Sequence, residues 1–354
     1  MARRQPVRIG VVGLGLIGLR HAAILARGDR VTLAGVADPS DAARQAADRM
    51  GVPCVPDLAA LLDLGVDGVI LASPTPMHAE QARAAVAAGV PALIEKPIAS
   101  DAIAAERVVA EAEAAGVPLL VGHHRRHNPL VRAAKEAIDA GRLGRVCTAQ
   151  ATCWFHKPGS YFDAAPWRKR TGAGPISVNL AHDIDLMRHL VGEISHVQAA
   201  AAPSSRGFEN EEVAAAVLTF ETGAIGTIAV SDIAVSPWSW EMTSAENPAY
   251  SATAESCYRI AGTDGALSIP DLRLWTHEGA PDWWSPIRAT SLMRAQADPL
   301  AAQIAHFAEV IEGEAAPLVS AREGLRTLQA LEAMTRAART GRVETLAKKP
   351  EIPE

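Results

Sequence analysis

A glycine pattern between two apolar segments near the N-terminus most constrains what this chain can fold into. Residues 12–21 read VGLGLIGLRH, in which Gly13, Gly15 and Gly18 follow the apolar run VRIGVV and precede a helical pattern. Between a strand and a helix, glycines at this spacing permit a tight turn, the approach of a pyrophosphate to the backbone and close packing of the helix on the strand. The N-terminal part is therefore expected to be a Rossmann domain.

The same strand and helix rhythm continues to about residue 121. Short Val/Ile/Leu runs alternate with Ala-rich amphipathic windows, which is typical of a parallel sheet whose strands are buried on both faces. Further strands are expected in VTLAGVAD, GVILAS, PALIEK and PLLVGH, and helices near 16–27, 40–50, 77–89 and 100–115.

The pattern changes after residue 122. One helix near 129–140 is followed by segments of alternating hydrophobicity, such as VAAAVLTF, which indicate an antiparallel sheet with one covered face. We therefore expect an α/β chain with an NAD(P)-binding Rossmann domain over residues 1–122. An α+β domain with a large, mostly antiparallel open sheet should follow over 123–354, with C-terminal helices at 298–340 packing at the domain junction.

Composition excludes several classes of protein. The 354 residues include 34 basic and 40 acidic side chains, which leaves no positive surplus for nucleic acid. The four cysteines form no CxxC pair, as expected where thiols stay reduced. No apolar segment is long enough to cross a bilayer and no export signal is visible, so we expect a cytoplasmic protein without a membrane partner.

An acidic residue after the second expected strand indicates which dinucleotide binds. Asp38 has the usual spacing for a carboxylate that binds ribose hydroxyls, and Pro39 and Ser40 offer no positive charge to a 2′-phosphate. NAD is therefore expected rather than NADP, although a glycine turn that binds nothing is the structural alternative. The expected cofactor contacts are Gly13, Gly15, Leu16, Ile17, Gly18, Asp38, Ser73, Pro74, Thr75, His78, Glu95 and Lys96.

Two further motifs carry candidate catalytic groups. LIEKPIAS at 93–100 places Lys96 at a strand end, where a lysine is either a solvated surface residue or a working group. GAGPISVNLAHDIDLMRHL at 172–190 predicts a helix on which His182 and Asp185 share a face, together with Val178, Asn179 and Leu186. A histidine titrates in the range that proton transfer needs, but a helix histidine paired for packing remains the alternative.

The glycine motif, the EKP of Glu95 to Pro97 and the segment 172–190 together resemble the glucose-fructose oxidoreductase and inositol dehydrogenase family, also called Gfo/Idh/MocA. The match runs over nearly the whole chain in order and spacing. By resemblance, Lys96 points at a substrate hydroxyl beside the nicotinamide, Pro97 is often cis, and His182 takes the hydroxyl proton with Asp185 orienting it. Many relatives have an aspartate where this chain has Val178, which puts the second acidic partner in doubt.

The resemblance implies an NAD-dependent oxidoreductase acting on a secondary hydroxyl of a sugar, a sugar acid or a cyclic polyol. An NAD-dependent glycoside hydrolase using transient oxidation, an NADP-preferring sugar reductase and a nicotinamide-binding sensor without turnover are the alternatives. A homodimer or homotetramer through the second-domain sheet is also expected.

Aromatic and polar side chains in the second half suit the recognition of a sugar or polyol. A sheet-surface loop or an oligomer contact is the alternative for the segment 154–174 that contains most of them. The expected substrate contacts are His124, Arg125, Trp154, Tyr161, Trp167, Arg168 and Asn179. The cluster of His123, His124 and His127 lacks the spacing of a zinc site, so no metal is expected. The long segment 236–250 is interpreted as either a lid or a subunit contact.

Overall fold

The computed structural model describes residues 5–346. Their contacts divide the chain into two compact units. Unit 1 contains the described residues up to His127 together with Ala297–Leu328, and unit 2 contains Asn128–Gln296 and the described residues from Gln329 onward. Residues 123–127 and 297–328, expected in the second domain, thus make most of their contacts within unit 1.

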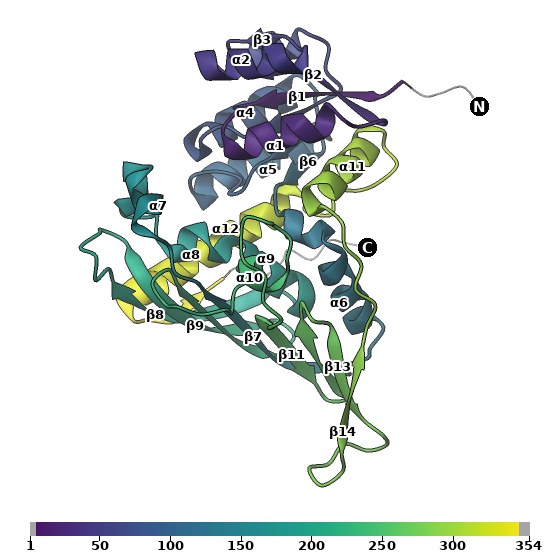
Figure 1. The fold of residues 1–354 in the computed structure, drawn as a ribbon, viewed down its shortest axis with the longest axis vertical. Coiled ribbons are helices and arrows are strands. Elements are labelled where there is room, and N and C mark those ends of the chain that lie inside the picture. Colours follow the sequence, from purple (N-terminus) through teal and green to yellow (C-terminus); the bar gives the residue numbers. More distant parts are fainter. Residues whose placement is uncertain (1–4, 347–354) are drawn as a thin grey trace. The chain divides into compact units, whose positions relative to one another are not determined.

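Unit 1 is built on a six-stranded sheet in which all paired neighbours are parallel. Its strands are β1 Val7–Val12, β2 Val31–Ala37, β3 Cys54–Val55, β4 Gly68–Leu71, β5 Ala92–Ile94 and β6 Leu119–Val121. The strand order is β3-β2-β1-β4-β5-β6, which reverses direction between β1 and β4 as in a Rossmann fold. Figure 1 labels β1, β2, β3 and β6 of this sheet. Sheets of this kind bind ligands at the carboxyl ends of the strands beside the reversal. The expected parallel sheet is confirmed, and only the short β3 was absent from the expectation.

Helices cover both faces of this sheet and bury its apolar strands. The helices of unit 1 are α1 Leu16–Leu25, α2 Asp41–Met50, α3 Leu58–Leu62, α4 Thr75–Ala87, α5 Ala102–Ala115 and α11 Pro299–Ile311, with the short 3-10 helix η1 His124–His127. Helices α1, α2 and α11 share one apolar core with Ile9 and Leu93, while α3, α4 and α5 share another with Val69 and Ile94. Adjacent strand residues thus point to opposite cores, which explains why the strands are apolar throughout.

Unit 2 contains a nine-stranded sheet in the order β14-β13-β12-β11-β7-β10-β9-β8-β15. Its strands are β7 Val146–Trp154, β8 Ile194–Pro203, β9 Glu211–Phe220, β10 Ile225–Ser231, β11 Tyr258–Gly262, β12 Gly265–Ile269, β13 Arg273–His277, β14 Ile287–Ser291 and β15 Glu344–Thr345. All neighbours are antiparallel except β7 and β10, which run parallel. The mostly antiparallel sheet expected from the alternating segments is confirmed.

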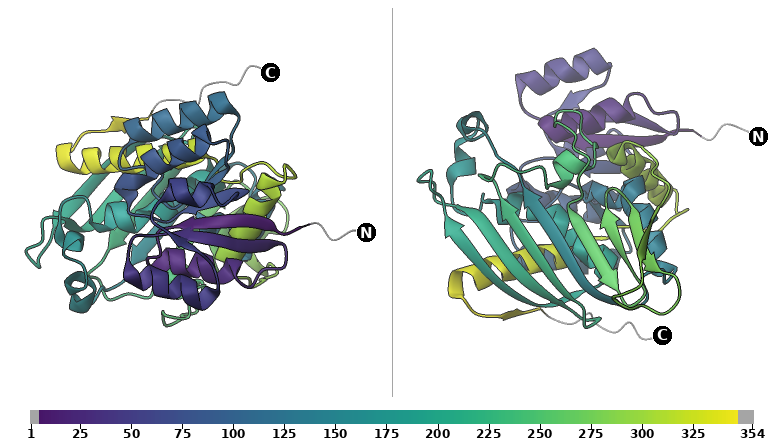
Figure 2. Two further views of the ribbon diagram at one scale, coloured as in Figure 1. Left: turned by 90° about the horizontal axis from the view of Figure 1, so that it is seen from above. Right: turned by 60° about the horizontal axis from the view of Figure 1, so that its bottom comes forward.

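Helices cover only one face of the unit 2 sheet, as Figure 2 shows. The helices of unit 2 are α6 Pro129–Asp139, α7 Gly159–Asp163, α8 Pro175–Val178, α9 Leu180–Val191 and α10 Trp240–Thr243, with the 3-10 helix η2 Pro166–Lys169. The long helix α12 Ala321–Thr340 begins in unit 1 and ends in unit 2. Along β9, Ala214, Ala216 and Leu218 are buried against α6, α9 and α12, whereas Val213 and Val217 are exposed.

Candidate active site

The glycine turn between β1 and α1 has two positions that require glycine and one that leaves open space. Gly13 has a φ of +84°, and a Cβ on Gly18 would lie 1.9 Å from the carbonyl oxygen of Gly13. A Cβ on Gly15 would have nothing within 4 Å. Gly13 and Gly18 are therefore fixed by the turn itself, while the exposed Gly15 provides the uncovered backbone that a pyrophosphate needs at a helix N-terminus.

Asp38 follows β2 and is held beside this turn by its own hydrogen bonds. The Leu14 N–H donates to its Oδ2 at 2.8 Å, and the backbone and hydroxyl of Ser40 donate to its Oδ1 at 2.9 and 2.7 Å. Burial alone would raise the pKa of Asp38, but these hydrogen bonds outweigh it and lower the pKa. The carboxylate therefore stays charged, as an acceptor of ribose hydroxyls must.

The loop after β4 joins the loop after β5 through a buried histidine. Pro74 caps α4 and Thr75 begins it, so Ser73 to Thr75 lie at the carboxyl end of β4 as expected. The ring of His78 lies 2.8 Å from the Ser73 carbonyl oxygen through Nε2 and 2.8 Å from the Pro97 carbonyl oxygen through Nδ1. His78 is only 2% exposed, so this buried side chain connects the loop after β4 to the loop after β5.

Lys96 follows β5 at the same edge, beside a buried carboxylate. The Lys96–Pro97 peptide bond is cis, in agreement with the resemblance. The preceding Glu95 accepts a hydrogen bond from His21 of α1 at 2.8 Å and one from the Lys96 backbone N–H at 3.2 Å. A Cβ on Gly122 would lie 2.9 Å from the Glu95 carboxylate, so the glycine after β6 makes room for it.

The charge of Glu95 is maintained by its neighbours in spite of burial. Burial alone would raise its pKa, but the hydrogen bond from His21 and the positive charges of His21, His124 and Lys96 lower it. His21 was not predicted from the sequence as part of the site. The available signal was a histidine three residues after Gly18, on a helix whose only other charged or polar side chain is the exposed Arg20.

Of the histidine cluster after β6, His124 and His127 lie in η1 and His123 directly precedes it. Arg125 is buried, Arg126 forms an ion pair with Glu323 at 3.0 Å, and the rings of His127 and His306 lie 5.3 Å apart. Across residues 5–346, no group of three or more His, Cys, Asp or Glu side chains is arranged to hold a metal ion. His124 and Arg125 remain predictions as substrate contacts.

Unit 2 contains a pocket of about 530 Å³ formed by three segments of its own chain. The first segment follows β7, the second is the junction of α8 and α9, and the third includes α10 and the loop after it. The lining residues are Phe155, His156, Lys157, Pro158, Tyr161, Val178, Asn179, Val235, Ser236, Glu241, Met242, Ala249, Tyr250 and Ser251. The segment 236–250 therefore contributes one wall of this pocket.

A buried lysine dominates the polar side of the pocket. The Lys157 side chain is 7% exposed, and its Nζ donates to Asn179 Oδ1 at 2.7 Å and lies 3.8 Å from Asp232 Oδ2. The same Nζ lies 5.0 Å from the ring centroid of Tyr161 and 5.9 Å from that of Phe155. Burial lowers the pKa of Lys157, and the negative charge of Asp232 acts in the opposite direction.

Some of the substrate contacts predicted from the sequence lie at this pocket, and others lie beside it. Tyr161 and Asn179 line the pocket. Arg168 stacks on the Tyr161 ring at 4.1 Å and donates to the Tyr161 carbonyl oxygen at 2.6 Å, and so supports the ring without lining the pocket. Trp154 packs edge-on against Trp238, and Trp167 is 57% exposed on η2.

The helix expected over 172–190 is divided into α8 and α9 at Asn179, whose side chain accepts the bond from Lys157. His182 and Asp185 are both buried on α9, with 8% and 0% exposure. The intervening Asp183 accepts a hydrogen bond from the Tyr258 hydroxyl of β11, which fixes α9 on the sheet. The catalytic roles of His182 and Asp185 remain predictions.

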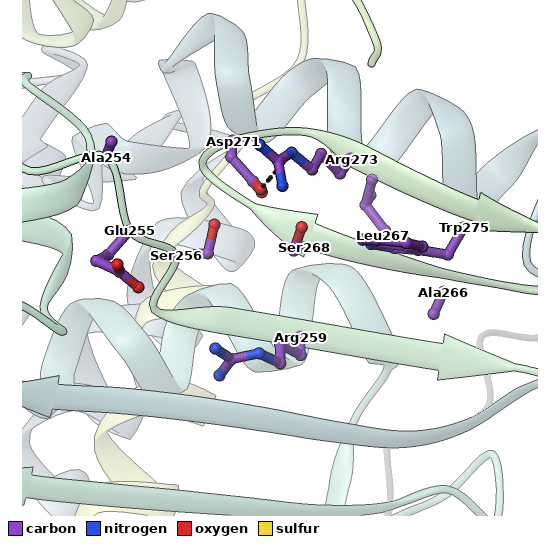
Figure 3. A pocket seen from close by; sticks show the side chains of 10 residues that line it. All are labelled: Ala254, Glu255, Ser256, Arg259, Ala266, Leu267, Ser268, Asp271, Arg273 and Trp275. Carbon is purple, nitrogen blue, oxygen red and sulfur yellow. Dashed lines mark ion pairs between the residues drawn. The ribbon is translucent and has the colours of Figure 1, made fainter. Parts of the chain in front are cut away.

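A second hollow, of about 340 Å³, lies over β11, β12 and β13 on the uncovered face of the sheet (Figure 3). Arg259 and Trp275 lie along it, and Asp271 pairs with Arg273 at 3.6 Å. None of the described residues that line it is a lysine or a histidine. Its acid–base groups are the carboxylates of Glu255 and Asp271, and Asp271 is already paired with Arg273, so we do not choose this hollow as the candidate active site.

Comparison with known proteins decides the family. A model described as "Oxidoreductase family, NAD-binding Rossmann fold" matches residues 7–123, and the "GFO/IDH/MocA C-terminal domain" model matches residues 131–268. The chain belongs to the Gfo/Idh/MocA family of oxidoreductases. Its cofactor is NAD, in agreement with the open glycine turn and the charged Asp38.

Named members of the Gfo/Idh/MocA family resemble parts of the chain. "Inositol 2-dehydrogenase 2" of Saccharopolyspora erythraea is 37% identical over 193 residues, which are 53% of this chain and 54% of that protein. "Myo-inositol 2-dehydrogenase" of Thermotoga maritima is 30% identical over 63% of this chain and 67% of that protein. The chain thus spans only about half the length of the first of these relatives.

Among solved structures of the family, the WlbA dehydrogenase from Bordetella pertussis in complex with NADH and UDP-GlcNAcA is 28% identical. The match covers 98% of this chain and all of that chain, with a TM-score of 0.77.

Within the described part of the chain, no helix has the length and apolar character needed to cross a bilayer.

The contrast between Gly15 and Gly18 gives a test of the cofactor turn. Gly15→Ala should leave the unfolding temperature unchanged, because the added methyl group meets open space, but should weaken NAD binding about tenfold or more by occupying the pyrophosphate position. Gly18→Ala should lower the unfolding temperature as well, because its methyl group collides with Gly13. Calorimetric titration with NAD and thermal unfolding measure the two effects, and full NAD affinity in Gly15→Ala would contradict this assignment.

The buried His21–Glu95 hydrogen bond gives a pH-dependent test. In the wild type the pKa of Glu95 is lower in the folded state than its ordinary value of 4.5, so the charged carboxylate stabilises the folded protein above pH 4.5. This contribution is lost as the pH falls through the pKa of the folded state. In His21→Leu, burial should raise the pKa, so the charged carboxylate becomes destabilising above pH 4.5. Urea unfolding should show a loss of about 3 kcal/mol at neutral pH that shrinks toward pH 4.5.

The surface variant His196→Leu is the matched control for this test. Its side chain is exposed, so its stability should follow that of the wild type at every pH. A His21→Leu defect of equal size at neutral and acidic pH would mean that Glu95 does not titrate as described.

Proposed function

We propose that this protein is an NAD-dependent oxidoreductase that transfers a hydride between a secondary hydroxyl of a sugar or polyol and the nicotinamide. The observation that carries the proposal is that Lys96 lies at the carboxyl edge of the same sheet that presents the glycine turn and Asp38. In a parallel sheet of this order, ligands bind along that edge. A lysine at this edge is therefore placed to take part in the reaction of a bound dinucleotide.

Gly13, Gly15, Gly18 and the N-terminus of α1 hold the pyrophosphate in this proposal, and Asp38 accepts the ribose hydroxyls. The remaining cofactor contacts in this proposal are Leu16, Ile17, Ser73, Pro74, Thr75, His78, Glu95 and Lys96. When bound, NAD supplies the nicotinamide carbon that accepts or gives the hydride.

The proton of the hydroxyl is assigned to two side chains of this chain. The Lys96 ammonium donates to the hydroxyl oxygen and stabilises the negative charge that develops there as the proton leaves. His182 takes that proton, because an imidazole titrates near neutral pH, and Asp185 orients the imidazole. Val178 provides no carboxylate, so this assignment uses no second acidic partner on the helix.

The names of the relatives support a sugar or cyclic polyol as the substrate. They include inositol 2-dehydrogenases, "D-apiose dehydrogenase" and "1,5-anhydro-D-fructose reductase". These names favour net oxidation or reduction over hydrolysis of a glycoside.

We assign cofactor binding to residues 1–122 and substrate binding to residues 123–354. We also propose that the protein is cytoplasmic.

The uncovered sheet face of unit 2 supports a homodimer or homotetramer. Val213, Val217 and Ile225 are exposed on this face, and a second copy would remove their apolar surface from water. Sedimentation velocity of the protein measures the oligomeric state.

Screening inositols, neutral sugars and sugar acids with NAD and with NADP tests the proposed activity. At least one compound should give net accumulation of reduced cofactor, with NAD preferred, because Asp38 would repel a 2′-phosphate. Release of a sugar from a glycoside without accumulation of NADH would instead indicate a hydrolase. No reduced cofactor with any compound, and no oxidation of NADH by the matching ketones, would contradict the proposal.

The replacement Lys96→Met tests the assigned lysine. Turnover should fall by about 10²–10³-fold or more, since the charge that stabilises the alkoxide is lost, whereas NAD affinity should change little. Stopped assays of turnover and calorimetric titration with NAD measure the two quantities. Lys135→Met, which removes a surface lysine paired with Asp139, is the control and should keep full turnover. A Lys96→Met enzyme with most of its activity would remove this lysine from the mechanism.

A further inference from the structure

The charged groups around Lys157 form a connected set. The Lys157 backbone N–H donates to the Asp232 carbonyl oxygen at 2.9 Å, which fixes the loop after β7 against the end of β10. The Asp232 carboxylate pairs closely with Arg206, and Arg206 also lies 3.8 Å from Glu212. The main partner of Asp232 is therefore Arg206, and Lys157 is its more distant neighbour.

The ammonium of Lys157 retains donors for a ligand. It has three N–H groups. Among the described residues, only Asn179 accepts one of them, because the 3.8 Å to Asp232 is beyond hydrogen-bond range. The rings of Tyr161 and Phe155 hold the cation from the sides. Because Lys157 lines the pocket, its remaining donors face acceptors that enter the pocket, either water or a ligand oxygen.

The charge balance of the pocket disfavours an anionic ligand. Asp232 and Glu241 both act on Lys157 as negative charges, and the positive charge of Arg206 offsets that of Asp232. Glu241 lines the same pocket and leaves it a negative charge. Arg206 is engaged by Asp232, and Arg168 is stacked on Tyr161. Neither arginine is a lining residue, so neither offers the paired donors that usually bind a carboxylate.

The remaining walls suit the CH faces of a ring. Phe155, Tyr161, Val178, Met242 and Tyr250 line the pocket, and its volume of about 530 Å³ accommodates a small ring. A hydroxylated ring combines such apolar faces with oxygen acceptors at its rim.

We propose that Lys157 is a specificity-determining residue that donates a hydrogen bond to a hydroxyl oxygen of an uncharged polyhydroxylated ring, with Asn179 fixing the direction of the ammonium. The identification of the ligand as a substrate rests on the proposed oxidoreductase function. The selection of a neutral ring over a ring that carries a carboxylate follows from the Glu241 carboxylate in the pocket wall and from described lining residues that include no arginine.

Direct binding of ligands to the protein tests this proposal independently of turnover. The probes are myo-inositol and two matched pairs, D-glucose with D-glucuronate and D-galactose with D-galacturonate, titrated by ligand-observed NMR with and without saturating NADH. At least one neutral probe should bind, and each neutral sugar that binds should do so about tenfold or more tightly than its acid. Failure of the oxidoreductase proposal would appear separately, as binding without any hydride transfer in the activity screen.

Two variants identify the residue responsible. Lys157→Met should lower the affinity for the neutral probe by about tenfold or more. Asn179→Ala should lower this affinity less, because the charge of Lys157 remains while its orientation is lost. Lys169→Met, a nearby lysine paired with Asp163 on the surface, is the control and should bind as the wild type does. Circular dichroism verifies that each variant is folded, and if Lys157→Met does not fold, Asn179→Ala decides alone.

Three results would overturn the proposal. The first is wild-type affinity in a folded Lys157→Met or, where that variant does not fold, in Asn179→Ala; Lys157 would then only pin the loop. The second is binding of an acidic probe as tight as that of its neutral partner. The third is no binding of any probe to the wild type.

Discussion

The hydrogen bond between His21 and Glu95 is the interaction on which the cofactor-binding unit depends. His21 lies on the helix that begins at the glycine turn, and Glu95 directly precedes Lys96 at the end of β5. This one buried contact therefore connects the backbone that faces a pyrophosphate to the lysine assigned to the chemistry. Removing either partner would leave a polar group buried without compensation, so the two sites cannot easily change position independently.

Unit 2 uses buried charge differently. Glu95 keeps its charge because neighbouring positive charges offset burial, whereas burial lowers the pKa of Lys157 and raises that of Asp232. A cation held so weakly by its protein partners gains most from an additional acceptor. The His21–Glu95 pair therefore has a structural role, whereas a ligand completes the hydrogen bonding of Lys157.

Much of unit 1 was predictable because its signals are local. The spacing of Gly13, Gly15 and Gly18, the position of Asp38 and the EKP motif each depend on a few neighbouring residues, and all lie where the sequence indicated. The pocket of unit 2 was only partly predictable. Tyr161 and Asn179 were identified, but the burial of Lys157 depends on Asp232, which is distant in sequence and joins it through the parallel pairing of β7 and β10. Alternating hydrophobicity predicts a sheet without showing which strands become neighbours.

The parallel pairing of β7 and β10 within an otherwise antiparallel sheet has a consequence for how such a protein can diversify. Both strands end at the same edge, so the segments that follow them, 155–174 and 232–257, leave the sheet side by side and face one another across the pocket. Insertions or exchanges in either segment could reshape ligand preference while the strands beneath stay intact. Proteins that diverge from one common fold can therefore change substrate by changes in these two segments alone.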